Sequence, residues 1–165
     1  MSNDAASYII RPVQAADRPE VERFLTQQWG VPMVVSRGKT HYPAELPGFV
    51  AIHAGKLLGL ITYRIEGSAC EIVTIDSLAE RIGIGAALIA AVREVVQREG
   101  CTRLWLITTN DNLNALRFYQ KRGFCLVAVH RNAVMESRRL KPQIPLLGHD
   151  DIPLRDEIEL EMQLD

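Results

Sequence analysis

The stretch that decides the fold runs from Ile72 to Phe124. It reads IVTID (72–76), then GIGA (83–86) opening an apolar-faced segment, then LWLITT (104–109), and finally NLNALRFYQKRGF (112–124). These blocks predict a strand, a glycine turn, a helix to residue 99, a second strand and a second helix. A strand–helix–strand connection is almost always right-handed, so the two strands are predicted to be parallel neighbours in one sheet.

The chain before this stretch predicts an antiparallel meander. Strands are expected at 49–53, 57–65 and 70–75, joined by turns at Ala54-Gly55 and Glu66-Gly67. A first short strand is expected at 8–11 and a helix from Asp17 to Trp29, with Glu20 completing a capping box and Val21, Phe24 and Leu25 on the buried face. The proline-rich segment 31–47 is expected to be loop or short helix.

The chain after this stretch predicts further elements around the sheet. Asn110 or Asp111 is expected to cap the second helix and Gly123 to end it. A strand follows at 124–129, and residues 135–155 predict a short helix and a loop. The tail 157–164 alternates strictly, which predicts a strand whose glutamates form one wet face.

The composition is that of one soluble globular domain, residues 1–165, with a formal net charge of −1. This charge gives no reason to expect nucleic acid or a membrane surface as partner. No secretory signal or membrane span is visible, so a cytoplasmic location is expected. The three cysteines (Cys70, Cys101, Cys125) are expected to be buried, reduced thiols, and the four histidines show no metal-ligand spacing, so no metal is expected.

The glycine turn and the second helix each carry a weak chemical signal. Gly83-x-Gly85 opens a helix, where free N–H groups favour an anion, although a plain tight turn explains it equally. It lacks the residues of a nucleotide-hydrolysing phosphate loop and of the dinucleotide fingerprint. Asn112, Ala115 and Tyr119 share one helical face, on which Tyr119 is either a proton donor or a packed aromatic residue.

Together the two motifs resemble the GCN5-related N-acetyltransferase (GNAT) superfamily over nearly the whole chain. The resemblance implies an α/β (α+β) fold with a mixed, mostly antiparallel sheet flanked by helices. It implies that the fourth and fifth strands are parallel and splay apart to admit acetyl-coenzyme A. It also implies an N-acetyltransferase that transfers the acetyl group to a primary amine of a small molecule or peptide by direct attack.

The resemblance also assigns site residues. It implies that the pyrophosphate of acetyl-coenzyme A binds at the glycine turn and that the cofactor's arm lies along the second helix. A backbone N–H at the end of the fourth strand would donate a hydrogen bond to the thioester carbonyl. The implied cofactor residues are Val73, Ile75, Arg81, Ile82, Gly83, Ile84, Gly85, Ala86, Asn112, Ala115 and Phe118. Tyr119 would be the general acid. Glu80 departs from the family pattern, which usually has Gln or Arg at this position, so its role stays open.

The general base and the acceptor site each have more than one candidate assignment. Glu71, expected to share a strand face with Val73 and Ile75, is the nearest match to the family's general base, and Asp76 is a weaker one. The acceptor would lie near Trp29, His41, Tyr42 and Arg138. The Arg138-Arg139 pair is either a solvated face or a clamp for an acidic acceptor.

Two other functions stay open at this point. The chain could be a non-catalytic acyl-coenzyme A-binding regulator, or an interaction domain without a cofactor. A homodimer is expected by family analogy only.

Overall fold

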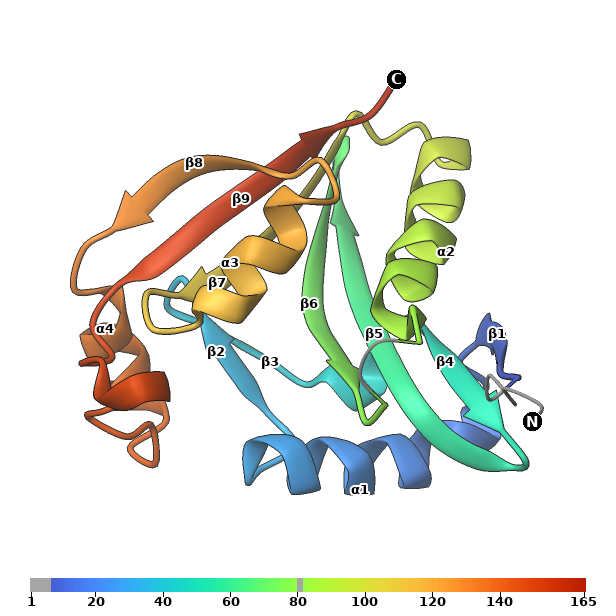
Figure 1. The fold of residues 1–165 in the computed structure, drawn as a ribbon, viewed down its shortest axis with the longest axis horizontal. Coiled ribbons are helices and arrows are strands. Elements are labelled where there is room, and N and C mark those ends of the chain that lie inside the picture. The colour runs from blue at the N-terminus through green and yellow to red at the C-terminus, as the bar shows by residue number, and fades with distance from the viewer. Residues whose placement is uncertain (1–6, 80–81) are drawn as a thin grey trace, which may run out of the picture.

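A seven-stranded sheet with strand order β1-β4-β5-β6-β7-β9-β8 organises the molecule (Figure 1). The computed structural model describes residues 7–79 and 82–165. The strands are β1 (Ile9–Pro12), β4 (Gly48–His53), β5 (Lys56–Glu66), β6 (Ala69–Ser77), β7 (Arg103–Thr109), β8 (Cys125–His130) and β9 (Glu157–Gln163). The helices are α1 (Arg18–Trp29), α2 (Ile84–Arg98), α3 (Leu113–Gln120) and α4 (Ala133–Leu140).

All strand pairs of this sheet are antiparallel except β6 and β7, which are parallel. Helix α2 forms the crossover between these two strands, as the order of sequence blocks predicted. The expected α/β fold with a mostly antiparallel sheet is therefore confirmed. In the full strand count the parallel pair is β6/β7 rather than the fourth and fifth strands.

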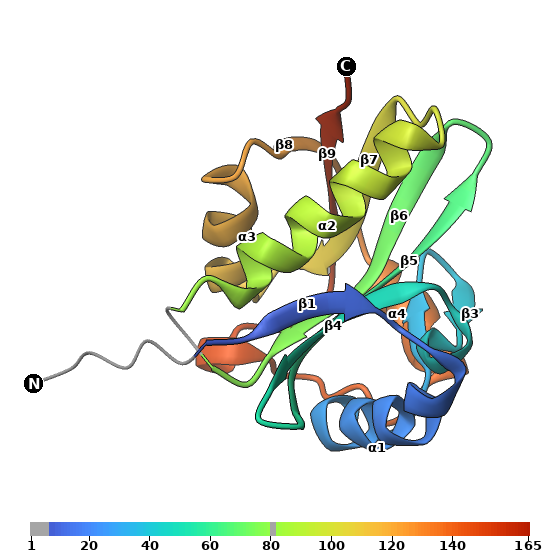
Figure 2. The same ribbon diagram turned by 90° about the vertical axis from the view of Figure 1, so that its right-hand side faces the viewer.

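Helices cover both faces of the sheet (Figure 2). The larger core lies between the sheet and α2, where Leu88 and Val92 pack against strand residues such as Ile61 and Leu104. A smaller core lies on the other face, where α1 packs Val21, Phe24 and Leu25 against β4 and β5. The buried faces of both helices follow from their apolar periodicity.

The start of α1 differs from the predicted capping box. Asp17 makes no side-chain cap to the helix. Its carboxylate instead accepts two hydrogen bonds from the guanidinium of Arg11, at 2.7 and 2.9 Å, and one from the backbone N–H of Gln14. The hydrogen bonds from Arg11 are the main cause that lowers the pKa of Asp17 to about 2. The ion pair with Arg11 therefore takes the place of a side-chain cap on α1.

Residues 31–47 also differ from the prediction. They contain a small antiparallel hairpin of β2 (Val34–Ser36) and β3 (Lys39–His41), followed by a 3₁₀ turn at Pro43–Glu45. Positive φ angles at Arg37 and Gly38 form the two-residue turn between the strands. Strands this short carry too little alternation to be recognised from sequence.

The three cysteines differ in their exposure. Cys70 and Cys101 are buried free thiols, but Cys125 is exposed on the edge strand β8, so its expected burial is wrong. Across residues 7–79 and 82–165, every helix is too short or too polar to cross a bilayer. In the same ranges no group of three His, Cys, Asp or Glu side chains is arranged to hold a metal ion.

Candidate active site

The parallel strands part halfway along their length. β6 and β7 pair from Ala69/Arg103 to Ile72/Leu106. Beyond that point β6 continues along β5 as far as Ser77, and β7 continues along β9 as far as Thr109 (Figure 1). The sheet therefore opens between the carboxyl ends of two parallel strands, the usual position for a binding crevice in such sheets.

A β-bulge at Val73 marks the point where β6 leaves β7. Thr62 lies opposite Thr74 and Tyr63 opposite Ile72, so Val73 is the additional residue on β6. The extra residue of a bulge has no partner in the hydrogen-bonded ladder, and it moves the side chains that follow to the opposite face of the sheet.

The bulge corrects the expected face of Glu71. From the register, Glu71 shares its face with Thr74 and Asp76 and not with Ile75. Ile75 turns to the other face and packs against the larger core. The hydroxyls of Thr62 and Thr74 hydrogen-bond across the strands at 2.7 Å and hold β5 and β6 together beside the bulge.

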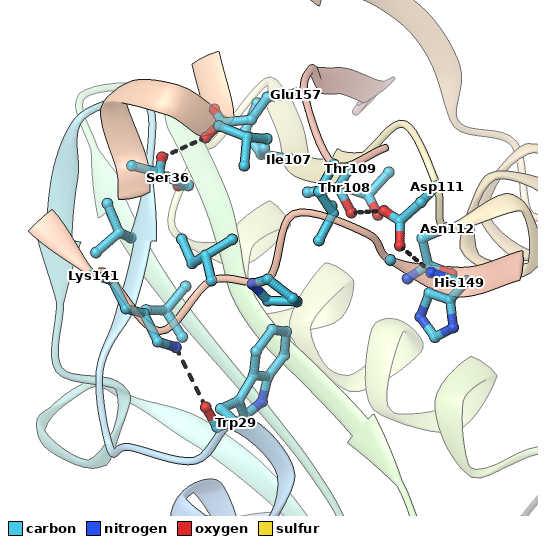
Figure 3. A pocket seen from close by; sticks show the side chains of 18 of the residues that line it. Trp29, Ser36, Ile107, Thr108, Thr109, Asp111, Asn112, Lys141, His149 and Glu157 are labelled. Carbon is cyan, nitrogen blue, oxygen red and sulfur yellow. Dashed lines mark hydrogen bonds between the residues drawn. The ribbon is translucent and has the colours of Figure 1, made fainter. Parts of the chain in front are cut away.

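A cleft of about 770 Å³ lies over this opening (Figure 3). Its walls come from the end of α1, β2, β6, β7, the start of α3, α4, the loop 141–154 and the first residue of β9. Of the residues expected from the sequence, the cleft is lined by Trp29, Glu71, Val73, Asp76 and Asn112. The volume is within the range of natural small-molecule sites.

Two carboxylates of β6 reach the cleft in a desolvated setting. Burial is the main cause that raises the pKa of both Glu71 and Asp76. The hydroxyl of Ser36 lies 3.4 Å from Glu71, and the indole N–H of Trp29 donates to Asp76 at 3.1 Å. A raised carboxyl pKa moves the group toward the range in which a general base works near neutral pH.

Tyr119 lies on α3 in the larger core and is only 7% exposed. Its ring packs edge-to-face against Phe118 and Phe124, with centroids 5.3 and 5.6 Å away. Burial, reinforced by the charge of Asp76, raises the pKa of the phenol, so it stays protonated. The residues that line the cleft do not include it.

Helix α2 begins at Gly83, which adopts a left-handed conformation with φ of 80° and gives no side-chain cap. The first amides of this helix, from Ile84 to Ala86, point toward its N-terminal end, where an anion is favoured. A Cβ at Gly85 would meet the Phe118 ring at 2.9 Å, so glycine here lets α2 and α3 approach closely. Arg81 and Glu80 lie outside the described residues.

Asn112 is the N-cap of α3, because its side-chain oxygen accepts a hydrogen bond from the amide of Ala115 at 3.1 Å. The sequence had favoured Asn110 or Asp111 for this cap. Asn110 instead accepts hydrogen bonds from the amides of Arg155 and Asp156, and Asp111 holds the loop through the amide of His149 at 2.8 Å.

Three residues expected at the acceptor site do not line the cleft. His41 is buried in the β2–β3 hairpin and Tyr42 is exposed. The guanidinium of Arg138 donates to three backbone carbonyls, at Ile144, Pro145 and Leu154. The structure therefore gives Arg138 contacts that hold the loop 141–154, while Arg139 pairs with Glu136 at the surface.

Sequence reasoning missed Glu157 and Lys141. Glu157 was expected on the wet face of β9, but it is 2% exposed and lines the cleft. Its carboxylate accepts hydrogen bonds from the hydroxyl of Ser137 at 2.9 Å and the amide of Arg37 at 3.0 Å. These partners are far away in the sequence, so nothing in the local alternation could reveal them.

A model of the acetyltransferase (GNAT) family matches residues 11–124. The chain belongs to this family. Within the acetyltransferase family it resembles the Bacillus subtilis (strain 168) protein YdhI, of uncharacterised function, with 45% identity over 152 residues, which cover 91% of this chain and 94% of YdhI. The expectation of an acyltransferase is thereby confirmed.

Solved acetyltransferase structures share the fold. An IAA acetyltransferase from Bacillus cereus ATCC 14579 superimposes with a TM-score of 0.73 at 21% identity, covering 96% of this chain and 100% of that one. A putative streptothricin acetyltransferase from Bacillus anthracis str. Ames, in complex with acetyl coenzyme A, superimposes with a TM-score of 0.68 at 17% identity, covering 98% and 99%. At these identities the likeness concerns the fold.

Proposed function

We propose that this GNAT chain is an acetyl-CoA-dependent N-acetyltransferase that acts on a primary amine of a small molecule or peptide by direct attack. The observation that carries the proposal is the parting of β6 and β7 at the Val73 bulge, which opens onto a cleft lined by Glu71. The acetyl coenzyme A held by the Bacillus anthracis relative supports the choice of cosubstrate.

The described residues fit this cosubstrate. The uncapped start of α2, from Ile82 to Ala86, offers amides for its pyrophosphate. The small Ala115, one turn after Asn112 on α3, leaves room beside the arm, and Phe118 borders α2 at Gly85. When bound, acetyl-CoA supplies an activated acetyl thioester. Arg81 stays a proposed phosphate contact outside the described residues.

Glu71 is the proposed general base. It lines the cleft beside the bulge, and its raised pKa favours proton uptake from an ammonium acceptor. The freed amine lone pair forms the new C–N bond at the thioester carbonyl as the C–S bond breaks. The nitrogen then loses its second proton, which balances the proton that the departing sulfur takes up.

The backbone N–H of Val73 is the proposed donor to the carbonyl oxygen as negative charge develops there, because a bulge residue is left without a ladder partner. Ile75 lies opposite Ile61 in the regular ladder, so we favour Val73 of the two. Tyr119, kept protonated by burial, is the proposed proton donor to the departing sulfur.

Acetyl-CoA titration by calorimetry, followed by thiol release with a panel of amines, tests the proposal. We expect binding and amine-dependent thiol release. Binding without release for every amine would favour the acyl-CoA-binding regulator, and no binding would leave an interaction domain.

A further inference from the structure

Acidic side chains from several elements meet in the cleft. Four carboxylates and a single lysine line it, together with one imidazole. They are Glu71 and Asp76 of β6, Asp111 before α3, Glu157 of β9, Lys141 after α4, and His149 of the loop. In the close view Glu157 and Asp111 lie on different sides of the cleft, with Asp111 next to His149 (Figure 3).

None of these four carboxylates forms an ion pair within the described part of the chain, although the charges of Arg64 and Lys39 act on Glu71 from outside the cleft. None of them is within salt-bridge distance of a Lys, Arg or His side chain, whereas acids elsewhere, such as Asp17 and Glu161, are paired. The ammonium of Lys141 donates to the backbone carbonyls of Trp29 and Met33, at 3.4 and 3.3 Å. Lys141 therefore forms no ion pair with the acids of the cleft.

Three of these acids, Glu71, Asp111 and Glu157, are almost fully buried. The contacts of Glu157 come from two neutral donors, Ser137 and the amide of Arg37, which orient the carboxylate without neutralising it. Unpaired charge in a low-dielectric concave site is costly, and it focuses a field that attracts the opposite charge. A cation in the cleft would offset this cost.

The aromatic wall of the cleft also suits a cation. Trp29 lines it and donates its indole N–H to Asp76, which places the edge of the ring next to a carboxylate. The ammonium of Lys141 lies 6.0 Å from the centroid of the same ring, so the indole face already has one cation near it. A further protonated nitrogen would bind Asp76 by a charged hydrogen bond.

We propose that the acceptor is an amine with at least one further protonated nitrogen and no acidic group, of the diamine or polyamine class. This inference rests on the proposed acetyl transfer. One nitrogen gives its proton to Glu71 and is acetylated, while the second stays protonated against Glu157 or Asp76. The arginine pair that could have bound an acidic acceptor is engaged elsewhere, because Arg138 holds the loop and Arg139 pairs with Glu136.

Three acceptors of nearly equal length test the proposal. Cadaverine carries a second ammonium, n-pentylamine a methyl group and 5-aminopentanoate a carboxylate at the far end. Thiol release from acetyl-CoA gives kcat/KM for each. We expect cadaverine to exceed n-pentylamine by about 10- to 100-fold, the range of one hydrogen bond to a charged group, and 5-aminopentanoate to be the poorest.

Variants that remove one negative charge show which carboxylate binds the second ammonium. Glu157→Gln and Asp76→Asn keep the side-chain shape, and at least one is expected to bring the cadaverine to n-pentylamine ratio toward one. Glu136→Gln is the matched control, because Glu136 is an exposed acid of α4 outside the cleft, and it should keep the ratio. If one variant fails to fold, the other still tests the assignment.

The outcomes separate this inference from the proposed function. Turnover of n-pentylamine or 5-aminopentanoate as efficient as that of cadaverine would overturn the dication inference while leaving N-acetyl transfer intact. Without turnover of any amine, the proposed function fails, and calorimetry of cadaverine against the CoA-loaded protein then decides the dication inference alone. Binding no tighter than that of n-pentylamine would refute it.

Discussion

Replacing Gly148 by alanine should detach the loop 141–154 from Asp111. A Cβ added at Gly148 would lie 2.5 Å from Cγ and 3.0 Å from Cβ of Asp111, against an ordinary contact of 3.4 Å or more. The loop must therefore shift by at least about 0.9 Å, the difference between 3.4 and 2.5 Å. A shift of that size along the 2.8 Å bond from the His149 amide to Asp111 would break it.

The cost follows from the charge of the acceptor atom. Loss of one hydrogen bond to a charged group costs about 1.5–3 kcal/mol. In a chain of this size each 1 kcal/mol lowers Tm by roughly 2–4 °C, so a decrease of about 3–12 °C is expected. Because Gly148 and His149 line the cleft, KM for the acceptor should also rise, by up to about tenfold if 1.4 kcal/mol of the loss falls on the acceptor complex.

Thermal unfolding, acceptor kinetics and acetyl-CoA calorimetry measure these effects. Affinity for acetyl-CoA should hardly change, since the start of α2 is remote from the loop in the sequence and in its contacts. Asp111→Ala provides the control background, because removing the carboxylate relieves most of the overlap. An equal cost of Gly148→Ala in both backgrounds, or no change in Tm and KM, would refute the reasoning.

The remaining predictions concern the opening between the strands. Glu71→Gln should lower kcat/KM by about 10²–10⁴. It should also remove the rise of activity with pH, which sets in above the ordinary glutamate range because burial raises this pKa; an unchanged pH–rate profile would exclude Glu71 as base. Tyr119→Phe should lower kcat by about 10² and leave acetyl-CoA affinity nearly unchanged, whereas equal losses would mean that the ring only packs. Thr62→Val or Thr74→Val alone should lower the free energy of unfolding, measured in urea, by about 1–3 kcal/mol, because one buried hydroxyl loses its hydrogen-bond partner. The double variant should lose less than either single variant, and additive losses would disprove the pairing.

Where the sequence pattern reflects a local face, it predicted the structure well. The turn at Ala54-Gly55, the antiparallel meander and helix α2 were confirmed, whereas the second turn lies at Gly67-Ser68 because Glu66 ends β5 and pairs with Ala69. The alternation of a strand and the 3.6-residue period of a helix report burial directly. The left-handed Gly100, which stops α2, is equally local.

The sequence did not predict the partners of two charged side chains. Asp17 was expected to cap α1 but pairs with Arg11. Arg138 was expected at the acceptor site but bonds to the loop carbonyls. These partners lie 6 to 16 residues away in the sequence, and no hydrophobic period marks them.

The sequence by itself determined the strand–helix–strand crossover from Ile72 to Phe124, the glycine turn and the family of the chain, because each rests on neighbouring residues. The tertiary structure alone decided which acids share the cleft. The bulge at Val73 changes the face of the residues that follow it and puts Asp76 on the same face of β6 as Glu71. The hairpin and α4 bury Glu157 through Arg37 and Ser137. A one-residue register change and contacts between distant segments leave no local pattern in the sequence, and these two features give the cleft its negative charge.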